Sequence, residues 1–189
     1  MSKKIVFLDR DGVINEYPGD GLYVLSKEQL RVFPYAGESI RRLKEAGYLV
    51  YIISNQACVS KGLISVEALK DMTGYLLSSL EQGQELIDGV YYCTHREEEN
   101  CPYRKPSPAL ILEALRTCGI SKDELNSSSF FIGDSLRDVK AAKAANLKSI
   151  IVLSGRESIE RKDSWEVKPD YIFKDLKEAV DFIVKNPKD

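Results

Sequence analysis

Two aspartates separated by one residue, Asp9 and Asp11, follow the largely apolar segment of residues 3–8 and precede Gly12. Because side chains alternate along an extended chain, both carboxylates can face the same side of a strand end, and Gly12 permits a turn directly afterwards. Paired carboxylates can hold a hard divalent cation such as Mg²⁺, or one of them can exchange protons as an acid or base. A polar turn without chemistry is the alternative, because turns are rich in Asp and Gly.

Other polar groups stand at comparable places further along the chain. Ser54 and Asp134 each follow an apolar segment, Asp138 lies four residues beyond Asp134, and Lys105 precedes an expected helix. Ser54 can donate a hydrogen bond to an anion or cap a turn, and Lys105 can attract an anion or be an ordinary solvated lysine. The carboxyl ends of parallel strands lie at one edge of a sheet, so we expect these groups to converge there with Asp9.

The periodicity of the apolar residues predicts the elements that position these groups. Runs of β-branched and aromatic residues predict strands at residues 3–8, 48–53, 89–92, 128–132, 149–153 and 171–173. Apolar residues at helical spacing predict helices at residues 36–46, 66–82, 108–117, 139–145 and 176–184. Because strands alternate with helices, we predict an α/β fold, a three-layer sandwich with a mainly parallel central sheet. The long polar connection at residues 9–27 is expected to fold over whatever binds at Asp9.

Composition narrows the class of protein. The chain has 189 residues, 43% of them hydrophobic, and 27 basic against 29 acidic side chains give a net charge of −2. This size and hydrophobicity predict a single domain over residues 1–189. The charge provides no basic field for nucleic acid, and no run approaches the roughly 20 apolar residues that a membrane span needs. With no apolar leader segment and four scattered cysteines, we expect a reduced, cytoplasmic protein and a monomer.

Taken together, four motifs resemble those of the haloacid dehalogenase superfamily of phosphohydrolases. Asp9-x-Asp11-Gly-Val is similar to the first motif, Ser54 to the second, Lys105 to the third, and Gly133-Asp134-x-x-x-Asp138 to the fourth. Within the superfamily, Phe-Leu-Asp-Arg-Asp-Gly-Val-Ile-Asn, Ser-Asn-Gln, Tyr-Cys-Thr-His and Arg-Lys-Pro-Ser-Pro resemble the D,D-heptose 1,7-bisphosphate phosphatases and the related histidinol-phosphate phosphatases. The resemblance spans residue 3 to about residue 155 and implies a compact Rossmann-like domain with no large cap domain.

The resemblance implies Mg²⁺-dependent hydrolysis of a phosphomonoester through an aspartyl-phosphate. Asp9 would be the nucleophile and Asp11 the acid and then the base. The side chains of Asp9 and Asp134 and the backbone carbonyl of Asp11 would hold Mg²⁺, while Ser54 would hold a phosphoryl oxygen. Physical reasoning agrees, because a carboxylate and a phosphate oxygen at about 4 Å repel by about 4 kcal/mol at an effective dielectric of about 20. Lys105 would be a second positive charge that relieves this repulsion.

The substrate is left open by the residues around these motifs. The resemblance implies that Lys61 and Arg104 contact a distal phosphate or sugar, that the backbone near Asn55 binds phosphoryl oxygens, and that Asp138 orients Lys105 or the metal site. Lys61 stands where the subfamily has arginine and lacks its bidentate fork. Heptose bisphosphate, histidinol phosphate and another small phosphomonoester are all candidates. A polynucleotide 3′-phosphatase and a phosphate-binding, receiver-like domain without turnover are further alternatives, and receivers lack the second aspartate.

A zinc loop is the last expectation from the resemblance. Relatives in the subfamily carry Cys-x-His, a spacer and Cys-x-Cys, to which Cys93, His95 and Cys101 correspond, with Tyr103 at the position of the fourth ligand. A structural zinc site normally has four protein ligands. The loop therefore either binds Zn²⁺ with a glutamate or water completing the shell, or is a zinc-free loop held by packing.

Overall fold

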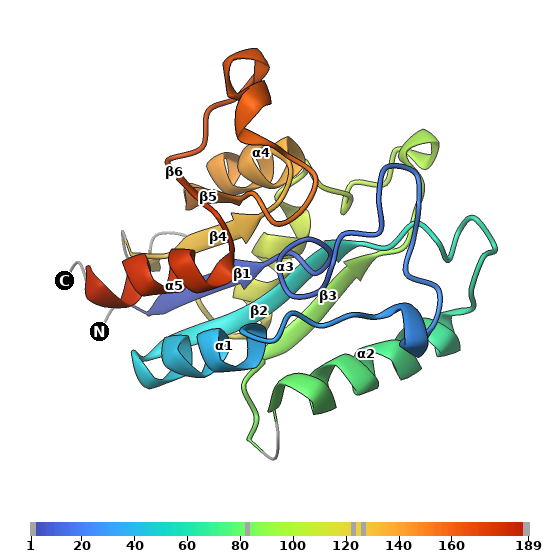
Figure 1. Ribbon diagram of the computed structural model, residues 1–189, viewed down its shortest axis with the longest axis horizontal. Coiled ribbons are helices and arrows are strands. Elements are labelled where there is room, and N and C mark those ends of the chain that lie inside the picture. The colour runs from blue at the N-terminus through green and yellow to red at the C-terminus, as the bar shows by residue number, and fades with distance from the viewer. Residues whose placement is uncertain (1–2, 82–83, 122–123, 126–127, 187–189) are drawn as a thin grey trace.

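A computed structural model describes residues 3–81, 84–121, 124–125 and 128–186 (Figure 1). Its centre is a six-stranded sheet of order β3-β2-β1-β4-β5-β6, in which every neighbouring pair is parallel. The strands are β1 (Lys4–Leu8), β2 (Tyr48–Asn55), β3 (Gly89–Cys93), β4 (Phe130–Gly133), β5 (Lys148–Val152) and β6 (Tyr171–Phe173). The predicted parallel α/β fold is confirmed.

Helices cover both faces of this sheet (Figure 1). They are α1 (Ala36–Glu45), α2 (Val66–Glu81), α3 (Ala109–Thr117), α4 (Leu136–Ala144) and α5 (Leu176–Lys185). Val6 and Leu8 of β1 pack into one core cluster with α1, α2 and α5, whereas Ile5 and Phe7 pack into the other with α3 and α4. The alternation of side chains along β1 therefore builds the predicted three layers.

Helix starts differ slightly from the predicted ones. The helix expected from Pro108 begins at Ala109, and the Ser107 hydroxyl accepts a hydrogen bond from the Ala109 amide at 3.3 Å. The fourth-motif helix α4 begins at Leu136 behind the N-cap Ser135, which leaves Asp134 in the turn before the helix. Gln82, the last residue of the helix predicted at residues 66–82, lies outside the described residues.

Backbone contacts join the two ends of the connection between β1 and α1. Asn15 and Val32 form an isolated antiparallel bridge, and the Phe33 amide donates to the Ile14 carbonyl at 3.0 Å. The tip between them rises at the carboxyl edge of the sheet (Figure 1). Along the part of the chain that the structure describes, connections at this edge carry only short 3-10 helices at Lys27–Gln29, Glu97–Glu99 and Ile159–Ser164. No large cap domain is present there, and none of the described helices is long and apolar enough to cross a membrane.

Candidate active site

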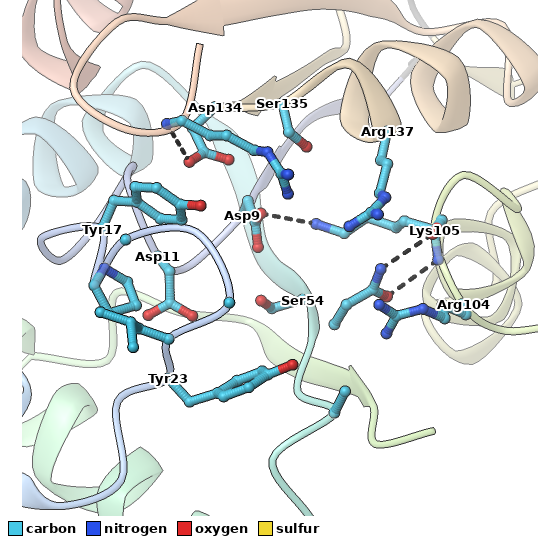
Figure 2. Close-up of a pocket in the computed structure, with 17 residues that line it drawn as sticks. Asp9, Asp11, Tyr17, Tyr23, Ser54, Arg104, Lys105, Asp134, Ser135 and Arg137 are labelled. Carbon is cyan, nitrogen blue, oxygen red and sulfur yellow. Dashed lines mark hydrogen bonds and ion pairs between the residues drawn. The ribbon is translucent and has the colours of Figure 1, made fainter. Parts of the chain in front are cut away.

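A pocket opens at the carboxyl ends of the central strands, where the sequence predicts the site (Figure 2). Of the predicted site residues, the structure brings seven to its wall: Asp9, Asp11, Ser54, Asn55, Arg104, Lys105 and Asp134. Asp9 and Asp11 follow β1, Ser54 and Asn55 end β2, and Asp134 follows β4. The tip of the long connection supplies Tyr17 and Tyr23 to the same wall, in agreement with the expectation that it folds over the site.

Lys105 is a buried ammonium with three acceptors. Its side chain is 3% exposed, and its Nζ lies 3.0 Å from Asp9 Oδ2, 2.6 Å from Asp138 Oδ1 and 2.9 Å from the Ile53 carbonyl oxygen. The Asn55 side chain fixes the Lys105 backbone, because it donates to the Lys105 carbonyl and accepts from the Lys105 amide, each at 3.1 Å. Lys105 is thus a counterion of the predicted nucleophile, and the alternative of a solvated lysine is wrong.

Asp138 is oriented by the start of α4. Its Oδ2 accepts hydrogen bonds from the Ser135 amide at 3.1 Å and from the Ser135 hydroxyl at 2.6 Å, which forms a capping box. A side chain at Gly133 would overlap Asp138, so this position needs glycine for Asp138 to lie where it does. With its other oxygen on Lys105, Asp138 occupies the expected supporting position.

Asp134 is enclosed by backbone. Its Oδ2 accepts a hydrogen bond from the Arg156 amide at 2.8 Å, and a Cβ at Gly12 or Gly155 would overlap the carboxylate. Gly12 also has a positive φ of 81°, which disfavours any other residue there. Burial, followed by the charges of Asp9 and Asp138, raises the pKa of Asp134 well above its usual value.

The acidic cluster fits a divalent cation. Asp9, Asp134 and Asp138 offer carboxylate oxygens that all lie within 4.8 Å of one another. Burial raises the pKa of Asp9 to about 6, although the charge of Lys105 opposes that rise. When all three carboxylates are ionised, the one ammonium of Lys105 leaves two excess negative charges. A cation with oxygen ligands such as Mg²⁺ would balance them. Because Asp138 is already engaged by Lys105 and Ser135, Asp9 and Asp134 are the side chains suited to hold it.

Ser54 and Asp11 contact other site residues as well as the pocket. The Ser54 hydroxyl accepts a hydrogen bond from Gln56 Nε2 at 3.1 Å, and Ser54 acts to lower the pKa of the neighbouring Asp9 against the larger effect of burial. The Asp11 side chain is 21% exposed, and its carboxylate binds Arg10. Ser54 therefore lies beside the predicted nucleophile in the pocket wall, and Asp11 keeps one exposed face.

The predicted substrate-contacting cations differ in placement. Arg104 lines the pocket, and its Nη1 donates to the His95 carbonyl at 2.9 Å. Lys61 is exposed and does not line the pocket. Its Nζ lies 5.1 Å from the centroid of the Tyr23 ring, so it reaches the site only through that ring.

Two arginines that the sequence reasoning missed also line the pocket. Arg137 binds Glu97 at 3.0 Å, and Arg156 binds Asp20 at 3.1 Å. The Arg156–Asp20 pair ties the long connection to the loop after β5, and the Tyr17 hydroxyl donates to the same Asp20 carboxylate at 2.6 Å. The signal of Arg156 in the sequence is weak, because this residue comes three residues after the predicted strand at residues 149–153 and belongs to no motif.

The expected zinc loop forms a cluster of three ligands. Cys93, His95 and Cys101 offer ligand atoms within 4.8 Å of one another. Burial raises the pKa of the Cys93 thiol, and the neighbouring Cys101 thiol adds to that rise. Tyr103, at the expected fourth position, is 46% exposed and interacts electrostatically with Arg116 of α3. The loop thus gathers three side chains of the types that bind thiophilic metal ions.

Sequence comparisons find relatives of the same length. A family model described as HAD-hyrolase-like matches residues 102–179. A D-glycero-D-manno-heptose-1,7-bisphosphate 7-phosphatase of Chlorobaculum tepidum is 36% identical over 95% of this chain and 93% of its own. A D-glycero-beta-D-manno-heptose-1,7-bisphosphate 7-phosphatase of Helicobacter pylori is also 36% identical, over 96% of this chain and 98% of its own.

Solved structures of heptose bisphosphate phosphatases also match most of this chain. The D,D-heptose 1,7-bisphosphate phosphatase of B. bronchiseptica, complexed with magnesium and phosphate, superposes with a TM-score of 0.86. It is 25% identical, and the match covers 96% of this chain and 98% of that one. The corresponding enzyme of Burkholderia thailandensis has a TM-score of 0.70 at 25% identity, covering 97% and 100% of the two chains.

Proposed function

We propose, for a chain that belongs to the haloacid dehalogenase-like phosphatases, that it hydrolyses the 7-phosphate of D-glycero-D-manno-heptose 1,7-bisphosphate. The names of relatives at 36% identity support the substrate. The observation that carries the chemistry is the buried Lys105 ammonium 3.0 Å from Asp9, with Asp134 in metal-binding range of the same carboxylate. This arrangement supports the proposal that a nucleophile, a cation site and a counterion surround a single position.

In the proposed reaction, Asp9 attacks phosphorus and the ester bond breaks, which gives an aspartyl-phosphate and an alkoxide. Asp11 donates a proton to the alkoxide. It then removes a proton from the water that attacks the aspartyl-phosphate, which releases inorganic phosphate and regenerates Asp9. Mg²⁺, held by the Asp9 and Asp134 side chains and the Asp11 carbonyl, would supply the positive charge that lets an anionic nucleophile approach an anionic ester.

Other residues hold the charge that develops on the phosphoryl group. Lys105 adds a fixed positive charge beside Asp9, and Asp138 keeps its ammonium in place. Ser54 and the backbone amide of Asn55 would bind phosphoryl oxygens. Arg104 would bind the second phosphate or the sugar, and its position in the pocket wall supports this role, whereas the position of Lys61 outside that wall does not.

A phosphate-release assay with and without Mg²⁺ tests the proposal. The panel contains the heptose bisphosphate, histidinol phosphate and several hexose phosphates. We expect the heptose bisphosphate to have the highest kcat/KM, with little release in the presence of a chelator. A higher kcat/KM for histidinol phosphate would overturn the substrate assignment, and no Mg²⁺-dependent release from any of the esters would overturn the phosphatase proposal.

We also propose that Cys93, His95 and Cys101 hold one Zn²⁺, with water as the fourth ligand. The support is the three-ligand cluster, in which Cys93 is buried. Metal analysis of protein purified without chelator should find one zinc per chain in the wild type and none in Cys93→Ser. Zinc-free wild-type protein would identify the cluster as a packed loop without metal.

A further inference from the structure

Arg10 lies between the two proposed catalytic aspartates and is almost completely buried. Its side chain is 2% exposed. The guanidinium contacts both oxygens of Asp11, with Nε 3.2 Å from Oδ1 and Nη2 3.0 Å from Oδ1 and 3.0 Å from Oδ2. This bidentate contact determines both the position of the Asp11 carboxylate and its rotation, which a point charge would not do.

Two amide side chains complete the arrangement around Asp11. Asn15 Nδ2 donates to Oδ1 at 2.8 Å, and Gln56 Nε2 donates to Oδ2 at 3.1 Å. A carboxylate has about four lone-pair sites, so Arg10, Asn15 and Gln56 occupy nearly all of them. All three donor side chains are buried, and the exposed part of Asp11 lines the pocket.

Arg10 is itself fixed from several sides. Its backbone amide donates to Asp9 Oδ1 at 2.7 Å, and its carbonyl accepts from the Ile14 amide at 2.8 Å. The guanidinium carbon lies 6.0 Å from the centroid of the Tyr92 ring, and the Tyr92 hydroxyl is in turn bound to Thr73. The backbone of Arg10 thus contacts Asp9, while its side chain holds Asp11.

We propose that Arg10 is a positioning residue for the reaction, which holds the Asp11 carboxylate at the distance and angle needed for proton transfer. The proposal rests on the acid–base role assigned to Asp11 above. Proton transfer requires the carboxylate within hydrogen-bond reach of the reacting oxygen, and a misplacement of about 1 Å can reduce the rate about 100-fold. A structural ion pair is the competing explanation, and it predicts that loss of Arg10 affects stability but not catalysis through Asp11.

A double-mutant cycle separates the two explanations. The variants are Arg10→Lys, Asp11→Asn and the double variant, assayed with p-nitrophenyl phosphate and Mg²⁺ so that the result does not depend on the heptose assignment. Lysine keeps the charge but loses the fork. We expect Arg10→Lys to lower kcat about 10- to 100-fold with KM within about twofold of wild type. In the Asp11→Asn background, the same change should alter kcat less than about twofold.

Controls keep the outcomes distinct. Arg42→Lys weakens another arginine–aspartate pair, with Asp181 between α1 and α5, and should leave kcat unchanged. If Arg10→Lys does not fold, as judged by circular dichroism, Gln56→Leu removes another donor to Asp11 in the same cycle. An equal loss from Arg10→Lys in both backgrounds, or no loss in either, would overturn the positioning role alone. Full activity of Asp11→Asn would overturn both the role of Asp11 and the inference built on it.

Discussion

At the scale of single residues, the fold holds three carboxylates so close together that they repel one another. Asp9, Asp134 and Asp138 are buried near one another with Lys105 as their shared ammonium. Burial raises the pKa of Asp9 and of Asp134. Such a cluster costs stability unless a cation binds, so its presence favours catalysis over a purely structural role.

Replacement of Asp9 by Asn should abolish turnover while the fold survives. The amide is nearly isosteric, but it cannot attack phosphorus, and it removes one of the mutually repelling charges. We expect a fall in kcat of at least about 1000-fold and an unchanged or higher melting temperature without Mg²⁺. Phosphate release and circular dichroism measure the two effects, and normal turnover would reject Asp9 as the nucleophile.

Replacement of Asp11 by Asn should slow both proton transfers and leave Asp9 able to attack. The phosphorylated enzyme then accumulates when its hydrolysis is slowed more than its formation. Intact-protein mass spectrometry after rapid acid quench should detect the phosphorylated form in Asp11→Asn and not in Asp9→Asn. Unchanged steady-state rates would remove Asp11 from the acid–base role.

Replacement of Lys105 by Met should destabilise the protein as well as inactivate it. The change leaves Asp9 and Asp138 without their shared ammonium, and breaking a buried ion pair from one side costs about 3–5 kcal/mol. Urea unfolding without Mg²⁺ measures this loss. Lys177→Met, which removes an exposed lysine 3.5 Å from Asp181, is the matched control and should cost less than about 1 kcal/mol.

At the scale of elements, strand ends and the turns after them position the site. β1, β2 and β4 bring Asp9, Ser54 and Asp134 to one edge, and the loop after β5 adds its backbone amide at Arg156. Glycine is required where this loop passes Asp134, because a Cβ at Gly155 would overlap the carboxylate. The surroundings of Asp134, a proposed metal ligand, are therefore built by backbone as much as by side chains.

Substitution of Gly155 by Ala should displace Asp134 and weaken metal binding. We expect a rise of about 10-fold or more in the Mg²⁺ concentration for half-maximal activity, since the displaced carboxylate is one of two proposed side-chain ligands. Gly74→Ala is the control, because Gly74 lies in α2 with open space around it and Ala favours helix. An unchanged Mg²⁺ requirement in Gly155→Ala would argue against Asp134 as a ligand.

At the scale of the whole molecule, both faces of one sheet are packed by helices. We propose that residues 1–189 form one domain that folds independently of the metal. Chelation of Mg²⁺ should then abolish activity and leave the far-ultraviolet dichroism unchanged. Urea unfolding should show one transition, stabilised by about 2.7 kcal/mol at Mg²⁺ concentrations 100 times Kd. Two transitions, or unfolding on chelation, would contradict this proposal.

Much of the fold could be predicted from the sequence because it depends on local periodicity. Buried runs such as that of β2 are apolar wherever they pack, and their alternation with amphipathic helices leaves few topologies other than a parallel sheet. The candidate site followed from the same rule, because Asp9, Ser54 and Asp134 each come within two residues of the end of a predicted strand. Arg156 comes three residues after one and was missed, since a lone arginine carries no motif.

The sequence by itself determined which groups meet at the carboxyl edge of the sheet, because strand direction places strand ends there whatever the side chains do. Only the tertiary structure decided how those groups are used. Asn55 fixes the backbone of Lys105, Lys61 lies outside the pocket wall, and Arg10 turns inward to hold Asp11. Side-chain direction and burial depend on contacts between residues far apart in the chain, and local sequence patterns carry no information about those contacts.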